Sequence, residues 1–184
     1  MTGRREVDGV DYFFDSDGVM QANRWIEQDG GSFYVQSSGA VATNTWLHLG
    51  DKWFYVDAKG IRAVGLVKVG TGWYHFSDDG VMSTGWKQID GSWYYLGDSG
   101  AMATGWQQIG GTWYYFDGSG AMATKKWIEG TFYVDDSGAM LVSTTRTIDG
   151  WNYTFDGNGR WITVNNGGYS CPAWAPIKGN ASSK

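Results

Sequence analysis

The chain of 184 residues contains twelve tryptophans, eleven tyrosines, eight phenylalanines and 29 glycines, but only two prolines. Large rings therefore alternate with turn-forming residues, which favours short strands joined by tight turns over helices. The formal net charge of −5 argues against a nucleic-acid-binding protein, because no cluster of lysine and arginine is present to neutralise phosphates. A single cysteine, Cys171, excludes an internal disulfide and any multi-cysteine zinc site.

No apolar run approaches the roughly 20 residues that a membrane-spanning helix needs. The first residues, MTGRREVDG, lack the apolar segment of a secretory signal peptide. We therefore expect either an intracellular protein or a fragment of a longer secreted chain.

Residues 1–162 form an array of about eight repeats, each about 20 residues long. The first repeat, residues 9–22, is partial and has Asp11 where the central tryptophan would stand. The second keeps Trp25, carries an extra glycine in its turn, and has Phe33 in place of the second tryptophan. These substitutions are typical of a terminal repeat, whose outer face meets water rather than another repeat.

The third repeat, residues 45–64, has both tryptophans, Trp46 and Trp53. The fourth has Leu66 at the first tryptophan position and keeps Trp73, with His75 at a tyrosine position. The fourth repeat is therefore expected to lack one indole of the pair.

The fifth and sixth repeats, residues 85–124, are identical at 14 of 20 positions and define the pattern. The seventh is two residues shorter between Trp127 and Phe132. The eighth, which ends at residue 162, has Thr145 and Asn152 at the two tryptophan positions. Beyond it the register is lost, and residues 163–184 are predicted to form a C-terminal linker or tail.

Each repeat is predicted to fold as a β-hairpin. In the fifth, residues 86–89 and 92–96 flank Asp90-Gly91, a strong signal for a two-residue hairpin turn. Pairing the two runs across this turn places Trp86 and Trp93 on one face and Tyr94 on the other, since side chains alternate along a strand. The fold class is therefore all-β, a solenoid of stacked hairpins.

Stacking brings the two tryptophans of one hairpin against a tyrosine of the next, so each candidate site spans two repeats. The complete groups are Trp46, Trp53 and Tyr74; Trp86, Trp93 and Tyr114; and Trp106, Trp113 and Tyr133. The partial groups are Leu66, Trp73 and Tyr94; Trp25, Phe33 and Phe54; and Trp127, Phe132 and Tyr153.

A half-open box of ring faces suits a quaternary ammonium such as choline, which is attracted to ring quadrupoles. The same rings could stack on sugars, and a third interpretation is that they only replace a hydrophobic core. Acidic turns such as Ser77 to Gly80 resemble the start of a calcium loop but lack its later ligands, and Asp and Gly are ordinary turn residues. With only His48 and His75, no catalytic group of residues recurs, so we expect neither an enzyme nor a metal or cofactor site.

The pattern GWxxIxGxWYYxxxxGAMATGW resembles the cell-wall-binding repeat of Gram-positive surface proteins, best known from choline-binding modules of lysins, and is related to glucan-binding repeats. The resemblance covers residues 9–162 and implies a left-handed superhelical solenoid, with choline held between successive hairpins by two tryptophans and one tyrosine. It further implies an extracellular, wall-associated module that binds phosphocholine on teichoic acid. Such a module would anchor an attached enzyme or adhesin. Glucan or another wall polysaccharide remains the alternative ligand.

Overall fold

The computed structural model describes residues 2–28, 30–166 and 170–172, and for the last of these segments it describes the backbone only. Every regular element in this part of the chain is a β-strand, and most strands have five residues. The strands are β1 Gly3–Val7, β2 Val10–Phe14, β3 Arg24–Gln28, β4 Gly31–Val35, β5 Thr45–Leu49, β6 Lys52–Val56, β7 Gly65–Val69, β8 Gly72–Phe76, β9 Gly85–Ile89, β10 Ser92–Leu96, β11 Gly105–Ile109, β12 Thr112–Phe116, β13 Lys126–Ile128, β14 Phe132–Val134, β15 Thr144–Ile148, β16 Trp151–Phe155, β17 Trp161–Asn165 and β18 Ser170–Pro172.

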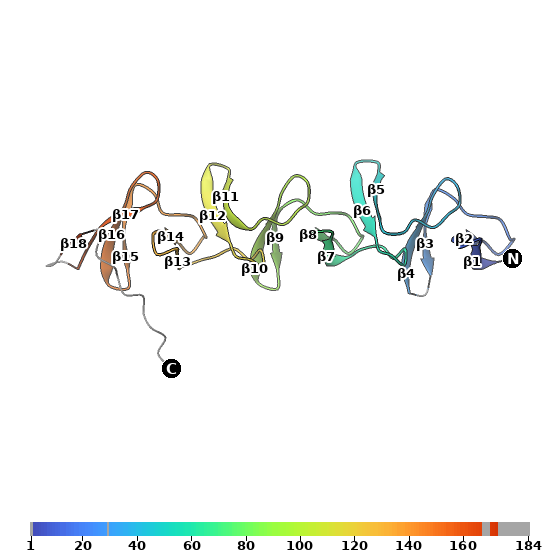
Figure 1. Cartoon of the computed structure of the whole chain (residues 1–184), viewed down its shortest axis with the longest axis horizontal. Helices are drawn as coiled ribbons and strands as arrows, with labels where there is room; N and C mark the ends of the chain where they lie inside the picture. The colour runs from blue at the N-terminus through green and yellow to red at the C-terminus, as the bar shows by residue number, and fades with distance from the viewer. Residues whose placement is uncertain (1, 29, 167–169, 173–184) are drawn as a thin grey trace, which may run out of the picture. The chain divides into compact units, whose positions relative to one another are not determined.

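Consecutive strands pair as separate two-stranded sheets up to β14, and a loop joins each hairpin to the next (Figure 1). The predicted register is confirmed in β11 and β12, where Trp106 is opposite Tyr115 and Gln108 is opposite Trp113. Asp90 and Gly91 both have positive φ, 49° and 81°, as a two-residue turn of this kind requires. The prediction of β-hairpin repeats is therefore correct.

The last sheet is larger, with strand order β15-β16-β17-β18. Strand β17 crosses the predicted boundary at residue 162 and pairs along β16, with Val164 opposite Tyr153. Val164 is buried. Most of the predicted linker, residues 167–169 and 173–184, lies outside the described residues.

The chain divides into two compact units. The first consists of Met1–Lys87 with Leu96–Met102, and the second of Gln88–Tyr95 with Ala103–Lys184. Each unit therefore contains several complete hairpins.

In each unit, the last residue of the second strand of several hairpins is deeply buried. These residues are at most 2% exposed. They are Val35, Val56, Phe76, Leu96, Phe116, Val134 and Phe155.

A recurring aspartate closes the loop after each of several hairpins. The Oδ1 of Asp57 accepts hydrogen bonds from the backbone N–H groups of Lys59 and Ile61, and Asp117 accepts from Ser119 and Ala121 in the same way. The hydrogen bond from the Ser119 hydroxyl is the main cause of a lowered pKa at Asp117. These carboxylates therefore have a structural role in the turns.

Candidate functional site

In the first unit, Trp46, Trp53 and Tyr74 converge as predicted. The Trp46 ring centroid lies 6.4 Å from that of Trp53 and 4.9 Å from that of Tyr74, with interplanar angles of 79° and 69°. We call these three rings, together with Met82, the Trp46 cage. They line a hollow of about 310 Å³, which Asp98 and Ser99 also line.

Two successive hairpins and the loop that follows the second of them supply the residues of the Trp46 cage. Trp46 and Trp53 come from β5 and β6, and Tyr74 comes from β8. The N–H of Met82, in the loop after β8, donates to the carbonyl of Trp53 at 2.8 Å. This bond places the methionine beside the rings, where a flexible thioether makes favourable contacts.

Trp53 is held from outside by His48, its cross-strand partner. The two rings are stacked, with centroids 4.5 Å apart and an interplanar angle of 21°. Trp53 nevertheless remains 43% exposed. An indole this exposed contributes little to the core.

The second unit contains a similar arrangement around Trp106. The rings of Trp106 and Phe132 lie 5.3 Å apart at 73°, and the N–H of Met140 donates to the carbonyl of Trp113 at 2.8 Å. We call Trp106, Trp113, Phe132 and Met140 the Trp106 cage. They line a hollow of about 430 Å³ together with Glu129, Gly157 and Asn158.

The third ring of the Trp106 cage differs from the prediction. We expected Tyr133 there, but Tyr133 pairs with Trp127 across β13 and β14, with ring centroids 5.1 Å apart. The hairpin is two residues shorter, so Phe132 takes the place that Tyr114 has in the preceding hairpin. Counting back from the Gly-Ala-Met motif at residues 138–140 gives the same alignment. The prediction placed Phe132 at the second tryptophan position only because it is aromatic, and that assignment is wrong.

The second repeat required the same correction. Phe33 was predicted at the second tryptophan position, yet the strand pairing puts Ser32 there, opposite Glu27. Phe33 instead packs on Phe13 of the preceding hairpin at 5.7 Å. The predicted contact between Trp25 and Phe54 is present, with centroids 5.4 Å apart.

Trp127 and Tyr153 also meet as predicted, at 4.8 Å, but they belong to a closed core. Tyr153 is 6% exposed and packs with Phe155 and Val164. Trp161 covers this cluster, and its indole N–H donates to the carbonyl of Gly130 at 3.0 Å. The repeat pattern does not predict this role of Trp161.

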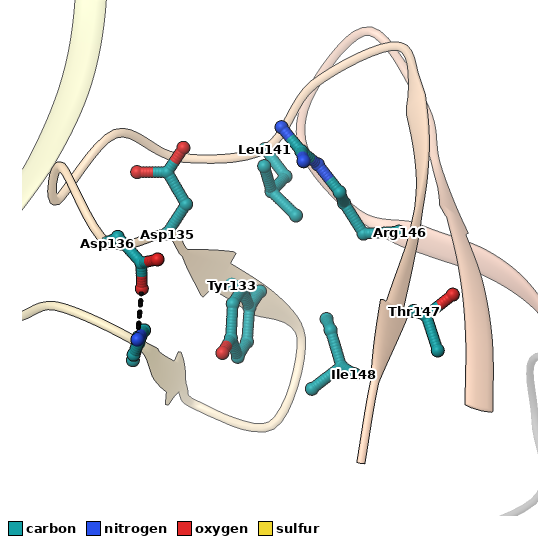
Figure 2. A pocket seen from close by; sticks show the side chains of 8 residues that line it. Tyr133, Asp135, Asp136, Leu141, Arg146, Thr147 and Ile148 are labelled. Carbon is teal, nitrogen blue, oxygen red and sulfur yellow. Dashed lines mark ion pairs between the residues drawn. The ribbon is translucent and has the colours of Figure 1, made fainter. Parts of the chain in front are cut away.

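Tyr133 faces a different hollow, of about 250 Å³, whose polar wall carries charges of both signs (Figure 2). The Nζ of Lys125 lies 3.0 Å from Oδ1 of Asp136, and both side chains are well exposed. Arg146, Asp135 and Ile148 also line this hollow. A wall of this kind does not resemble the ring-lined cages.

The remaining predicted groups straddle the two units. Trp73 belongs to the first unit and Tyr94 to the second, while Trp86 belongs to the first and both Trp93 and Tyr114 to the second. These two groups therefore remain predictions.

Family models match this chain over most of its length. The choline-binding repeat model matches residues 1–46, 63–104, 83–127 and 103–145, and a putative cell wall binding repeat model matches residues 44–61. The chain belongs to the choline-binding repeat family. The search of curated protein sequences finds no match.

Solved structures of choline-binding proteins from Streptococcus pneumoniae align with this choline-binding repeat chain. CbpJ shows 37% identity and a TM-score of 0.78 over 88% of this chain and 58% of its own. Choline binding protein F, solved with a tetrasaccharide-pentapeptide peptidoglycan analogue, shows 35% identity and a TM-score of 0.77 over 88% of this chain and 58% of its own. The phage Cp-1 endolysin complexed with choline shows 31% identity and a TM-score of 0.50 over 66% of this chain and 37% of its own.

The predicted fold class, an all-β solenoid of hairpin repeats, is thus confirmed. The chain spans just over half the length of CbpJ and of choline binding protein F. Among the described residues, none forms a helix long and apolar enough to cross a membrane, and none of the histidine, cysteine, aspartate and glutamate side chains gather in a group of three that could hold a metal ion.

Alkaline pH is expected to destabilise the closed core around Tyr153. Burial, and then Asp149, raise the pKa of the Tyr153 phenol. Because folding favours the neutral phenol, this contribution to stability is fully present below the unfolded value near pH 10 and is lost as pH rises through the higher folded value. Tyr153→Phe keeps the ring but removes the ionisation, so its alkaline unfolding midpoint, followed by circular dichroism, should lie at higher pH. An unchanged midpoint would contradict this.

Proposed function

We propose that this chain is a non-catalytic binding module that holds choline in its aromatic cages, as phosphocholine on cell-wall teichoic acid. The chain belongs to a family whose members are wall-associated surface proteins. Of the aligned proteins, choline binding protein F was solved with a peptidoglycan analogue and the phage Cp-1 endolysin with choline. In a longer protein, the module would anchor an attached enzyme or adhesin to the wall from outside the cell.

The observation that carries the proposal is the lining of the two cages. Each hollow combines two tryptophans, a third ring and a methionine with one carboxylate, Asp98 in one and Glu129 in the other. Among the described residues, neither lining includes a lysine or an arginine, although Arg160 Cζ lies 5.8 Å from the centroid of Phe132. Ring faces and a carboxylate both attract a cation, and a trimethylammonium group needs no hydrogen-bond acceptor.

Each contact of this kind is worth about 0.5–2 kcal/mol, so a single cage is expected to bind weakly. Several cages on one chain compensate for this when the ligand is repeated along a polymer. Once one cage is occupied, the effective concentration of choline at the next is high, and attachment is firm without any new contact.

A titration with choline tests the proposal, with 3,3-dimethyl-1-butanol and dextran as matched comparisons. We expect choline to change tryptophan fluorescence saturably and to raise the melting temperature, because the ligand binds only the folded stack. The neutral isostere has the same shape without the charge, so it should bind far more weakly. A response to dextran with none to choline would instead favour the polysaccharide ligand.

A further inference from the structure

Arg62 occupies the position that a methionine occupies in both cages. Its backbone N–H donates to the carbonyl of Ser32 at 2.9 Å, as Met82 donates to the carbonyl of Trp53. Ser32 in turn has the second tryptophan position of its hairpin. We use junction for the contact between one hairpin and the next. The junction where Trp25 meets Phe54 thus has the same backbone hydrogen bond as the Trp46 cage, but different side chains.

The side chain of Arg62 also follows the path of the methionine. Its aliphatic stem lies against Gly80, where a Cβ would collide with it, and Met82 lies against Gly100 in the same manner. Gly80 and Gly100 both have positive φ, 77° and 78°. This glycine row confines the stem, so the head group of Arg62 is directed to the ring that the methionine would contact.

The guanidinium of Arg62 lies over the Trp25 ring, with Cζ 5.3 Å from the centroid. Its Nε is buried and, among the described residues, has no hydrogen-bond acceptor. A buried N–H without an acceptor is unfavourable unless a ring face takes its place. The Arg62 head group is therefore positioned by Trp25 rather than by a carboxylate.

The junction between the first hairpin, β1–β2, and the second, β3–β4, is filled in a related way. Arg4 and Asp11 stand at the two tryptophan positions of their hairpin, opposite Phe13 and Glu6. Arg4 Nη2 lies 2.6 Å from Asp11 Oδ2, and its Cζ lies 4.8 Å from the centroid of Phe33 in the next hairpin. Here too a cation of the chain covers the aromatic ring.

We propose that Arg4 and Arg62 act as built-in cations that close the first two junctions to quaternary ammonium ligands. The site over Trp25 keeps two aromatic rings and the backbone hydrogen bond of a cage. It is closed because the Arg62 guanidinium occupies the place that the ligand's cationic group would take. At the Trp106 cage Arg160 also lies over a ring, with Cζ 5.8 Å from the Phe132 centroid, but Met140 keeps the position that Arg62 takes at Trp25, and Arg160 does not line the hollow. Ligand binding is therefore assigned to later junctions, where a methionine holds this position. This inference rests on the proposed function, since it assigns which of the junctions accept choline.

The test is a choline titration followed through the indole N–H signals of each tryptophan in NMR spectra. Four variants of the whole chain are compared with the parent: Arg62→Met, Ser32→Trp, the double variant with both changes, and Arg24→Met. Arg24 is an exposed cation on the hairpin that carries Trp25, and among the described residues its side chain hydrogen-bonds only to Gln21. Its removal therefore controls for the loss of a positive charge.

In the parent, the signals of Trp46 and Trp53 should shift on titration while that of Trp25 stays in place. Arg62→Met should make Trp25 respond saturably, and the double variant should respond at lower choline concentration because it adds a second indole wall. Ser32→Trp and Arg24→Met should leave Trp25 silent. Retained responses of Trp46 and Trp53 show that each variant is folded.

Two results would overturn the inference while leaving the proposed function intact. One is a Trp25 response in the parent over the same choline range as Trp46. The other is a silent Trp25 in both variants that lack Arg62. If Trp46 and Trp53 also stay silent in the parent, the proposed function fails, and the inference fails with it.

Discussion

Replacing Phe76 with alanine is expected to lower the free energy of unfolding by about 3–5 kcal/mol, the range for removing a fully buried phenylalanine. Phe76 is 0% exposed and packs with Tyr55 and Ala63. Its ring centroid lies 5.7 Å from that of Trp46, so the cavity left by the substitution would open beneath the Trp46 cage. Chemical denaturation followed by far-UV circular dichroism measures the loss.

Val64→Ala is the matched control, because Val64 is 51% exposed in the loop before β7. This change should alter the free energy of unfolding by no more than about 0.5 kcal/mol. Phe76→Ala should also weaken choline binding at the Trp46 cage, since the floor of the cage would relax. A loss of stability similar to that of Val64→Ala would mean that Phe76 does not belong to the core of its unit.

The hairpins themselves were predictable because their signals are local. Asp90-Gly91 and the alternation around it identify a turn and a register without reference to any other repeat. The same holds for Trp46, Trp53 and Tyr74, since exact 20-residue spacing carries the pattern from one repeat to the next. Where the spacing is regular, knowing which side chains share one face of a hairpin also identifies the residues that meet between successive hairpins.

The errors arose where the spacing changes. Phe33 and Phe132 are predicted at the second tryptophan position because they are aromatic, yet each stands in a hairpin with an altered turn. The strand pairing instead aligns each of them with the residue that supplies the third ring of a cage. The alignment depends on which residues hydrogen-bond across the hairpin, and an inserted or deleted turn residue changes that pairing. The loop motif that follows the second strand is the safer reference.

Arg62 and Trp161 illustrate a second limit. Both stand at the position that a methionine has in the two cages. Their roles depend on which side chains the preceding hairpin presents to them. The backbone N–H of Trp161 donates to the carbonyl of Thr131, and that of Arg62 donates to the carbonyl of Ser32. Thr131 and Ser32 thus stand at the second tryptophan position of their hairpins. No pattern within a single repeat predicts such compensation, because the two positions are about 30 residues apart in sequence.

Replacing Trp53 with alanine is expected to abolish measurable choline binding at the Trp46 cage while leaving the Trp106 cage intact. Loss of one ring contact of about 2 kcal/mol corresponds to a roughly 30-fold weaker site, and an already weak site would then leave the measurable range. Because Trp53 is 43% exposed, the stability of the unliganded chain should change little. Calorimetric titration with choline, read as the number of sites, measures the loss.

Trp113→Ala is the mirror-image variant, since Trp113 has the same strand position in the other unit and is 39% exposed. Trp151→Ala is the control, because Trp151 is 38% exposed at the start of β16 and lines neither cage hollow. Each cage variant should remove one site and spare the other, and the control should remove none. If Trp53→Ala and Trp113→Ala instead weakened both cages equally and lowered the melting temperature without ligand, these exposed indoles would be structural. The carboxylates Asp98 and Glu129 would then need another explanation.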